Sequence, residues 1–214
     1  MKLLAALSVL LIPCCAASSA HRVKVAHAGM IRIGDVEPET LAGVQELFDM
    51  RVRAGDRNIL FRIDSFGGSI FDGLDFMQHV EDAKKRNNIT VTCVVDTHAM
   101  SMGFVFLQDF CDTRLMTKRS VLLAHNGSAR AAGTSEEMKR TAKFLEEISN
   151  ALSEVCAARL NISVAEYKAK IQHADWVFGW EEALAVGAVD GVVNVSDLPP
   201  DFSLTPTGLF GSLF

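Results

Sequence analysis

Short apolar runs alternate along this chain with longer segments in which apolar residues recur every three or four positions. Runs at 59–63, 91–95 and 121–124 have the length and composition of strands, and they are mostly apolar, as in a sheet covered on both faces. Segments from Pro38, from 69 to 83 and from 134 to 159 have helical spacing. The alternation predicts an α/β fold with a mainly parallel sheet.

Weaker patterns complete the expected order. Further strands are expected at 23–33, 115–116 and 189–193, and further helices at 102–110, after Ser163 and at 180–186. We find no internal repeat, and 214 residues favour a single domain.

The first twenty residues have the pattern of a secretory signal peptide. Lys2 gives a positive start, 3–12 is almost entirely apolar, and the small residues 17–20 offer a cleavage site before His21. The apolar run is shorter than the ~20 residues that a membrane span needs. We therefore expect a signal peptide at 1–20, one domain at 21–195 and an irregular C-terminal tail at 196–214. An uncleaved N-terminal anchor is the alternative, and a lipoprotein is disfavoured because Pro13 precedes the first cysteine.

The helix expected from Thr134 to about residue 159 is unusually long. Thr134 and Glu137 have the spacing of a capping box. Six apolar positions keep one face along the helix: Met138, Ala142, Leu145, Ile148, Leu152 and Cys156. Because a mean helix has about 11–12 residues, this one is expected to project from the domain. Its apolar face then needs a partner, which predicts a homo-oligomer.

Three cysteines remain once the expected signal peptide is removed. Cys93, Cys111 and Cys156 can form at most one disulfide. We interpret all three as small buried apolar residues rather than ligands or nucleophiles. No pair has the spacing of a metal site, and we expect neither a metal nor another cofactor.

Charge gives no sign of a nucleic-acid partner. The formal net charge is -5, and the densest basic run, 84–86, ends a predicted helix, where cations suit the helix dipole. The chain has no zinc-finger spacing, phosphate loop or basic stripe interleaved with aromatic residues.

The stretch 99–103, Ala-Met-Ser-Met-Gly, follows an apolar strand and precedes a predicted helix. A serine at such a turn presents its hydroxyl at the sheet end, and the next N–H, of Met102, lies at a helix start. Gly67 and Gly68 follow another strand, and their lack of side chains allows a backbone to approach a substrate. Ser101 is therefore a candidate nucleophile, with the N–H groups of Gly68 and Met102 as candidate oxyanion donors.

A serine nucleophile needs a base, and the base needs an orienting acceptor. His125 ends the strand 121–124, at a position where loops assemble sites on α/β sheets, and it is our candidate base. Asp175 lies in an expected loop between helices and is our candidate acceptor. Asp64 and Asp96 compete with it, and spacing alone does not separate the three.

These motifs, in this order, resemble those of the proteolytic subunit of the Clp protease. The likeness extends from about Val25 to Val193, and its pieces are 63–69, 99–103, 122–125, 175–178, 182–183 and 187–190. The stretch 63–69 is similar to the family's Asn-Ser-Pro-Gly-Gly turn, 99–103 to its Ala-Ala-Ser-Met-Gly motif and 122–125 to its Ile-Met-Ile-His. The combination is specific, whereas each piece alone is not.

The resemblance implies a catalytic triad of Ser101, His125 and Asp175 with an oxyanion hole at Gly68 and Met102. It also implies a spiral of βαβ units, the ClpP/crotonase-like fold, in which the long helix is a protruding handle. Two stacked seven-membered rings would join through these handles around a chamber. The implied substrates are peptides or unfolded proteins.

The chain departs from the family pattern at several points. Phe66 replaces a proline, while Asn126 and Gly127 replace the glutamine and proline that follow the histidine, which affects contacts with a bound substrate strand. The expected signal peptide argues against an ATP-dependent unfoldase partner, because an exported compartment lacks ATP. Asn126 also begins a glycosylation sequon beside His125, where a glycan would obstruct the site. A bacterial periplasm is therefore the expected location.

We predict a serine endopeptidase that works through an acyl-enzyme, and three alternatives remain. A Ser–Lys dyad of the signal peptide peptidase type would use Lys139 or Lys143, although His125 in its matching context argues against it. A crotonase-like acyl-CoA enzyme conflicts with export and with the absence of an adenine or phosphate motif. A non-catalytic scaffold would use the long helix for assembly alone.

Overall fold

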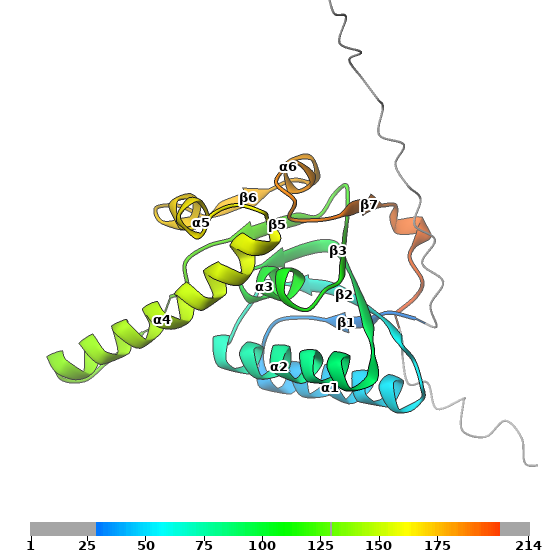
Figure 1. The fold of residues 1–214 in the computed structure, drawn as a ribbon, viewed down its shortest axis with the longest axis horizontal. Helices are drawn as coiled ribbons and strands as arrows, with labels where there is room; N and C mark the ends of the chain where they lie inside the picture. Colours follow the sequence, from blue (N-terminus) through cyan, green and yellow to red (C-terminus); the bar gives the residue numbers. More distant parts are fainter. Residues whose placement is uncertain (1–28, 129, 202–214) are drawn as a thin grey trace, which may run out of the picture.

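The computed structural model describes residues 29–128 and 130–201, and Figure 1 shows their arrangement. The strands are β1 (Ile31–Ile33), β2 (Asn58–Ser65), β3 (Thr90–Met100), β4 (Thr113–Thr117), β5 (Val121–Ala124), β6 (Trp176–Phe178) and β7 (Gly191–Val193). The helices are α1 (Pro38–Arg53), α2 (Ile70–Asn87), α3 (Met102–Asp109), α4 (Ser135–Arg159), α5 (Val164–Ile171), α6 (Trp180–Ala185) and the 3-10 turn η1 (Val195–Asp197).

The strands form one sheet in the order β1-β2-β3-β4-β7, and all of these neighbours are parallel. Each parallel step is made through a crossover, and three of these crossovers contain the helices α1, α2 and α3. The α/β fold with a mainly parallel sheet is therefore confirmed.

Strand β3 is longer than the strand predicted from the apolar run at 91–95. Its C-terminal part is more polar but still pairs with a neighbouring strand. Its first half pairs with β4, from Thr92 to Val95, while its second half, from His98 to Met100, pairs with β5. Strand β5 then pairs antiparallel with β6. The end of β3 thus joins the main sheet to a small second layer.

Helices α1 and α2 lie side by side and cover one face of the sheet (Figure 1). The core beneath them is rich in phenylalanine, and Phe48, Phe61, Phe76, Phe106 and Phe110 are all fully buried and in ring contact. A smaller cluster on other strand positions includes Leu60, Val94 and Leu115, with Leu198 packed against it.

Helix α4 projects away from the body of the molecule, as its length indicated (Figure 1). Its capping box is present, and only Ser153, Cys156 and Ala157, near its C-terminal end, are buried. Met138 and Phe144 on the projecting part remain exposed. The helix therefore leaves apolar side chains without cover in the single chain.

The interpretation of the cysteines needs a correction. All three are buried, as expected, but Cys93 and Cys111 form a disulfide rather than two separate apolar residues. Cys93 lies in β3 and Cys111 follows α3, so the bond closes a loop that contains Ser101. Cys156 is the free thiol.

Other differences concern short elements. Residues 176–178, for which the sequence predicts no element, form β6. Of the strand expected at 23–33, the last residues form β1, and residues 23–28 lie outside the described residues. The expected signal peptide and the end of the expected tail also lie outside them. The start of the tail is tied to the sheet, because Met30 N donates to the carbonyl of Pro200. Within the described ranges, no helix combines the length and apolarity required to cross a bilayer.

Candidate active site

Three polar side chains lie one residue beyond the ends of three neighbouring strands. Ser101 follows the last residue of β3, His125 follows the last residue of β5, and Asp175 precedes the first residue of β6. Because β3 pairs with β5 and β5 with β6, these ends meet at one edge of the small layer. The geometry therefore follows from strand pairing.

Ser101 occupies a strained turn between β3 and α3. Its backbone has φ 53° and ψ -123°, a region that residues with a side chain rarely adopt. The turn is held by a bond from Ser101 N to the carbonyl of Leu123 and by the close approach of Gly67. A strand–helix turn of this kind exposes the serine hydroxyl in the nucleophile turns of α/β-hydrolases.

The His125 ring lies within hydrogen-bond distance of this hydroxyl. Its Nε2 atom is 2.8 Å from Ser101 Oγ. When the ring carries its proton on Nδ1, the hydroxyl donates to Nε2, which is the geometry that a general base requires.

The register between β5 and β6 places Asp175 opposite His125. The paired residues are Leu122 with Phe178, Leu123 with Val177 and Ala124 with Trp176, and the next positions beyond the two strand ends are residue 125 and residue 175. His125 Nδ1 is 3.8 Å from Asp175 Oδ1, and the Asp175 side chain is 60% exposed. This ion-pair distance is longer than a hydrogen bond, a common feature of catalytic groups without a bound substrate.

The two competing aspartates have other partners. Asp64 accepts hydrogen bonds from Thr97 and Arg62, while Asp96 is paired with Arg62 and Arg119. Both carboxylates are therefore paired with arginines and lie in one hydrogen-bond network. Of the three aspartates, Asp175 is the one that lies beside His125.

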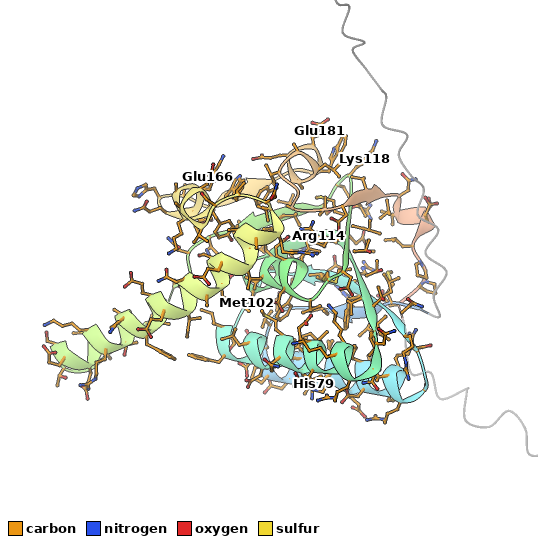
Figure 2. The ribbon with its side chains drawn as sticks, in the orientation of Figure 1. His79, Met102, Arg114, Lys118, Glu166 and Glu181 are labelled. Carbon is orange, nitrogen blue, oxygen red and sulfur yellow. A yellow bond between two sulfur atoms is a disulfide. The ribbon has the colours of Figure 1, made fainter. Side chains whose placement is uncertain are left out.

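The backbone at Gly68 and Met102 flanks the serine. Gly68 lies opposite Val36 in a short parallel bridge, in which Val36 N–H donates to the carbonyl of Gly67 and Ser69 N–H donates to the carbonyl of Val36. The N–H of Gly68 itself therefore points away from Val36. Met102 is the first residue of α3, where N–H groups have no partner within the helix. Both residues line the same pocket as Ser101, and the side chain of Met102, which is labelled in Figure 2, reaches Gly73 of α2.

This pocket, of about 120 Å³, lies between α3, α4 and α5 and contains Ser101 and His125 in its wall. Apolar side chains provide much of the lining: Ile70, Phe104, Val105, Leu152 and Ile171. Cys156 and Tyr167 also line it, and both are buried.

Cys156 and Tyr167 remain neutral near pH 7. Burial raises the pKa of the Cys156 thiol to about 12. The hydrogen bond with Tyr167 acts to lower this pKa, but its effect is smaller. Burial likewise raises the pKa of the Tyr167 phenol, with a further contribution from Cys156. A neutral thiol is a poor nucleophile, whereas the Ser101 hydroxyl has the His125 ring as a neighbouring base, so Ser101 remains the candidate nucleophile.

Neither lysine of the dyad alternative has its ammonium directed to the serine. Lys139 is paired with Glu136 and Lys143 with Glu147, and both side chains are at least 70% exposed on the projecting part of α4. Among the described residues, no cluster of three His, Cys, Asp or Glu side chains has the arrangement of a metal site.

The parallel βαβ units, the second layer at the end of β3 and the projecting helix define an α/β protein of the ClpP/crotonase fold. Residues 22–196 match the family model described as Clp protease, and the chain belongs to the Clp protease family. It is 30% identical over 155 residues to the ATP-dependent Clp protease proteolytic subunit 3 of Rhodococcus jostii (strain RHA1). That match covers 72% of this chain and 74% of the relative.

Several pocket residues were not anticipated. Tyr167 and Leu152 occupy ordinary inner-face positions of α5 and α4, so sequence spacing assigned them only to packing. Trp176 lies outside this pocket and is the first residue of the three-residue strand β6, which is too short for an alternation pattern to predict a strand there.

Proposed function

We propose that this protein is a serine endopeptidase that hydrolyses peptides or unfolded polypeptides through an acyl-enzyme. The observation that carries the proposal is the 2.8 Å contact between Ser101 Oγ and His125 Nε2 beside an apolar pocket. Membership of the Clp protease family supports the same activity.

In the proposed mechanism, His125 removes the hydroxyl proton as Ser101 Oγ attacks the substrate carbonyl carbon. The carbonyl oxygen becomes negative and is held by the N–H groups of Gly68 and Met102. Protonated His125 is stabilised by Asp175 and gives its proton to the leaving amine. Water, deprotonated by His125, then attacks the acyl-enzyme and releases the carboxylic acid and Ser101.

The pocket provides the basis for substrate choice. Its volume of about 120 Å³ and its apolar lining favour a medium-sized apolar side chain before the cleaved bond. A charged side chain would lose its hydration there without a counter-charge, because Cys156 and Tyr167 are both neutral.

We also propose that the protein acts outside the cytoplasm, in a bacterial periplasm, without an ATP-dependent unfoldase. The signal-peptide pattern of residues 1–20 and the Cys93–Cys111 disulfide support this location, since disulfides persist in oxidising compartments. N-terminal sequencing of the mature protein from a bacterial host should begin at His21. A chain that keeps its first residues and stays in the cytosolic fraction would contradict export.

The activity is tested by labelling with a fluorophosphonate, which reacts with activated serines. The wild-type protein should be labelled, with the adduct mapped to Ser101, and Ser101→Ala should abolish labelling and peptide hydrolysis. Ser135→Ala, on the exposed first turn of α4, is the matched control and should react like the wild type. Full labelling of Ser101→Ala, or no labelling of the wild type, would refute the proposal.

A further inference from the structure

The position of Asp175 depends on a very short strand. No hydrogen bond to its carboxylate is found within the described part of the chain, and its side chain is largely exposed. Its place beside His125 is therefore set by the backbone of β6, which has three residues and, among the strands of residues 29–128 and 130–201, pairs with β5 alone. A shift of β6 would move Asp175 directly.

Side chains anchor β6 from its buried face. Phe178 stacks on Phe104 of α3 with ring centroids 5.6 Å apart, and Trp176 lies against Phe178 at 4.2 Å. The outward residue between them, Val177, is half exposed and adds no such anchor. Trp176, the neighbour of Asp175, is thus the anchor closest to the candidate site.

The indole of Trp176 is buried and also meets the ring of Tyr167 edge-on, with centroids 6.3 Å apart, but it is not packed on every side. One side of Trp176 borders a cavity of about 790 Å³ between α5 and α6, lined also by Leu160, Ile162 and Leu184. A cavity offers no packed atoms to oppose movement of the ring. Because this side lacks packed atoms, a directional contact made by another part of the indole is needed to fix its position.

Glu182 supplies that contact. The Trp176 Nε1–H donates to Glu182 Oε1 at 3.0 Å, which ties the strand to α6. The ammonium of Lys170 lies 5.0 Å from the ring centroid and adds a cation–π contact. A hydrogen bond to a carboxylate is the stronger and more directional of the two.

We propose that Glu182 is a positioning residue for the reaction: through its bond to Trp176 it fixes β6 and so keeps Asp175 beside His125. The inference rests on the proposed peptidase function. Glu182 touches neither Ser101 nor the pocket, and it acts through the indole and the strand. Its loss would let the indole turn toward the cavity and carry Asp175 away from the imidazole.

The test compares Glu182→Ala with Glu182→Gln, whose amide oxygen still accepts from the indole without a charge. Glu182→Ala should lower kcat about 10-fold with KM unchanged, far less than the ~10⁴-fold loss seen when a triad aspartate is replaced. Glu182→Gln should restore the wild-type kcat. Glu181→Ala, on the exposed neighbour that points outward in Figure 2, is the matched control.

An Asp175→Asn background separates positioning from general destabilisation. There Glu182→Ala should produce no further loss, because the carboxylate that it positions is already absent. An equal loss in both backgrounds, or a wild-type kcat for Glu182→Ala, would overturn the proposal. If Glu182→Ala does not fold, Trp176→Phe removes the same donor and keeps an aromatic ring, and a wild-type kcat in that variant overturns the proposal equally.

Hydrogen exchange gives a readout that does not depend on activity. The amides of β6 should exchange faster in Glu182→Ala than in Glu181→Ala. Unchanged exchange would contradict the positioning role even in an active enzyme. If Ser101→Ala is still labelled, the peptidase function is refuted. The exchange result then tests separately whether Glu182 anchors β6.

Discussion

At the scale of single residues, the site depends on a glycine that contacts the serine. A Cβ atom added to Gly67 would lie 2.5 Å from Ser101 Cβ and 3.0 Å from Ser101 Oγ. The strained backbone of Ser101 is therefore packed directly against the turn that precedes α2. Any side chain at Gly67 must displace the hydroxyl or the turn.

We expect Gly67→Ala to lower kcat/KM about 100-fold, since a misplacement of about 1 Å can have that effect on a positioned group. Gly55→Ala is the matched control, because Gly55 also has a positive φ, 96° against 100° at Gly67, but has no atom within 4 Å of an added Cβ. Both variants carry similar backbone strain, and only Gly67→Ala should lose activity. Peptide hydrolysis and thermal unfolding of the two variants check this, and equal activities would contradict it.

Ser101 and His125 could be singled out as candidates from the sequence because each follows a recognisable apolar strand. It left Asp64, Asp96 and Asp175 open, since the choice depends on which carboxylate the fold brings to His125. That is decided by the register of β5 against β6, two short strands more than fifty residues apart in sequence. No local pattern encodes such a register.

At the scale of elements, the long strands and helices were predictable because their apolar periodicity extends over several turns or residues. Strand β6 was not, since three residues carry too little pattern. The bond between Cys93 and Cys111 was also missed, because pairing depends on how β3 and the end of α3 meet in space. Burial of both residues, by contrast, followed from the apolar runs around them.

The disulfide should stabilise the unit that carries Ser101, the candidate nucleophile. It joins residues 18 positions apart, and closing a loop of about this length contributes about 3 kcal/mol to the free energy of unfolding. The double variant Cys93→Ala, Cys111→Ala should therefore unfold at lower urea concentration than the wild type. A reducing agent should lower the wild-type midpoint by a similar amount and leave that of the double variant unchanged. A wild-type midpoint that does not respond to reduction would contradict the prediction.

At the scale of the whole molecule, the single chain leaves a long helix half uncovered. The buried residues of α4 are confined to its C-terminal part, and the projecting part presents Met138 and Phe144, with Phe144 stacked on Phe71 of α2. An exposed apolar surface of this kind marks an interaction site. Members of the Clp protease family assemble into oligomers, and the projecting part of α4 offers an apolar surface for such assembly.

We expect the protein to form a homo-oligomer through α4, and a charge on its apolar face should break it. Met138→Glu places a carboxylate in the expected interface, where loss of hydration without a partner is unfavourable by several kcal/mol. Arg140→Gln is the matched control, since it changes the net charge by the same amount and lies about 200° around the helix from Met138. Sedimentation analysis should show a smaller species for Met138→Glu and the wild-type species for Arg140→Gln. If Met138→Glu sediments like the wild type, the assembly surface lies elsewhere, and the exposed face of α4 has another role.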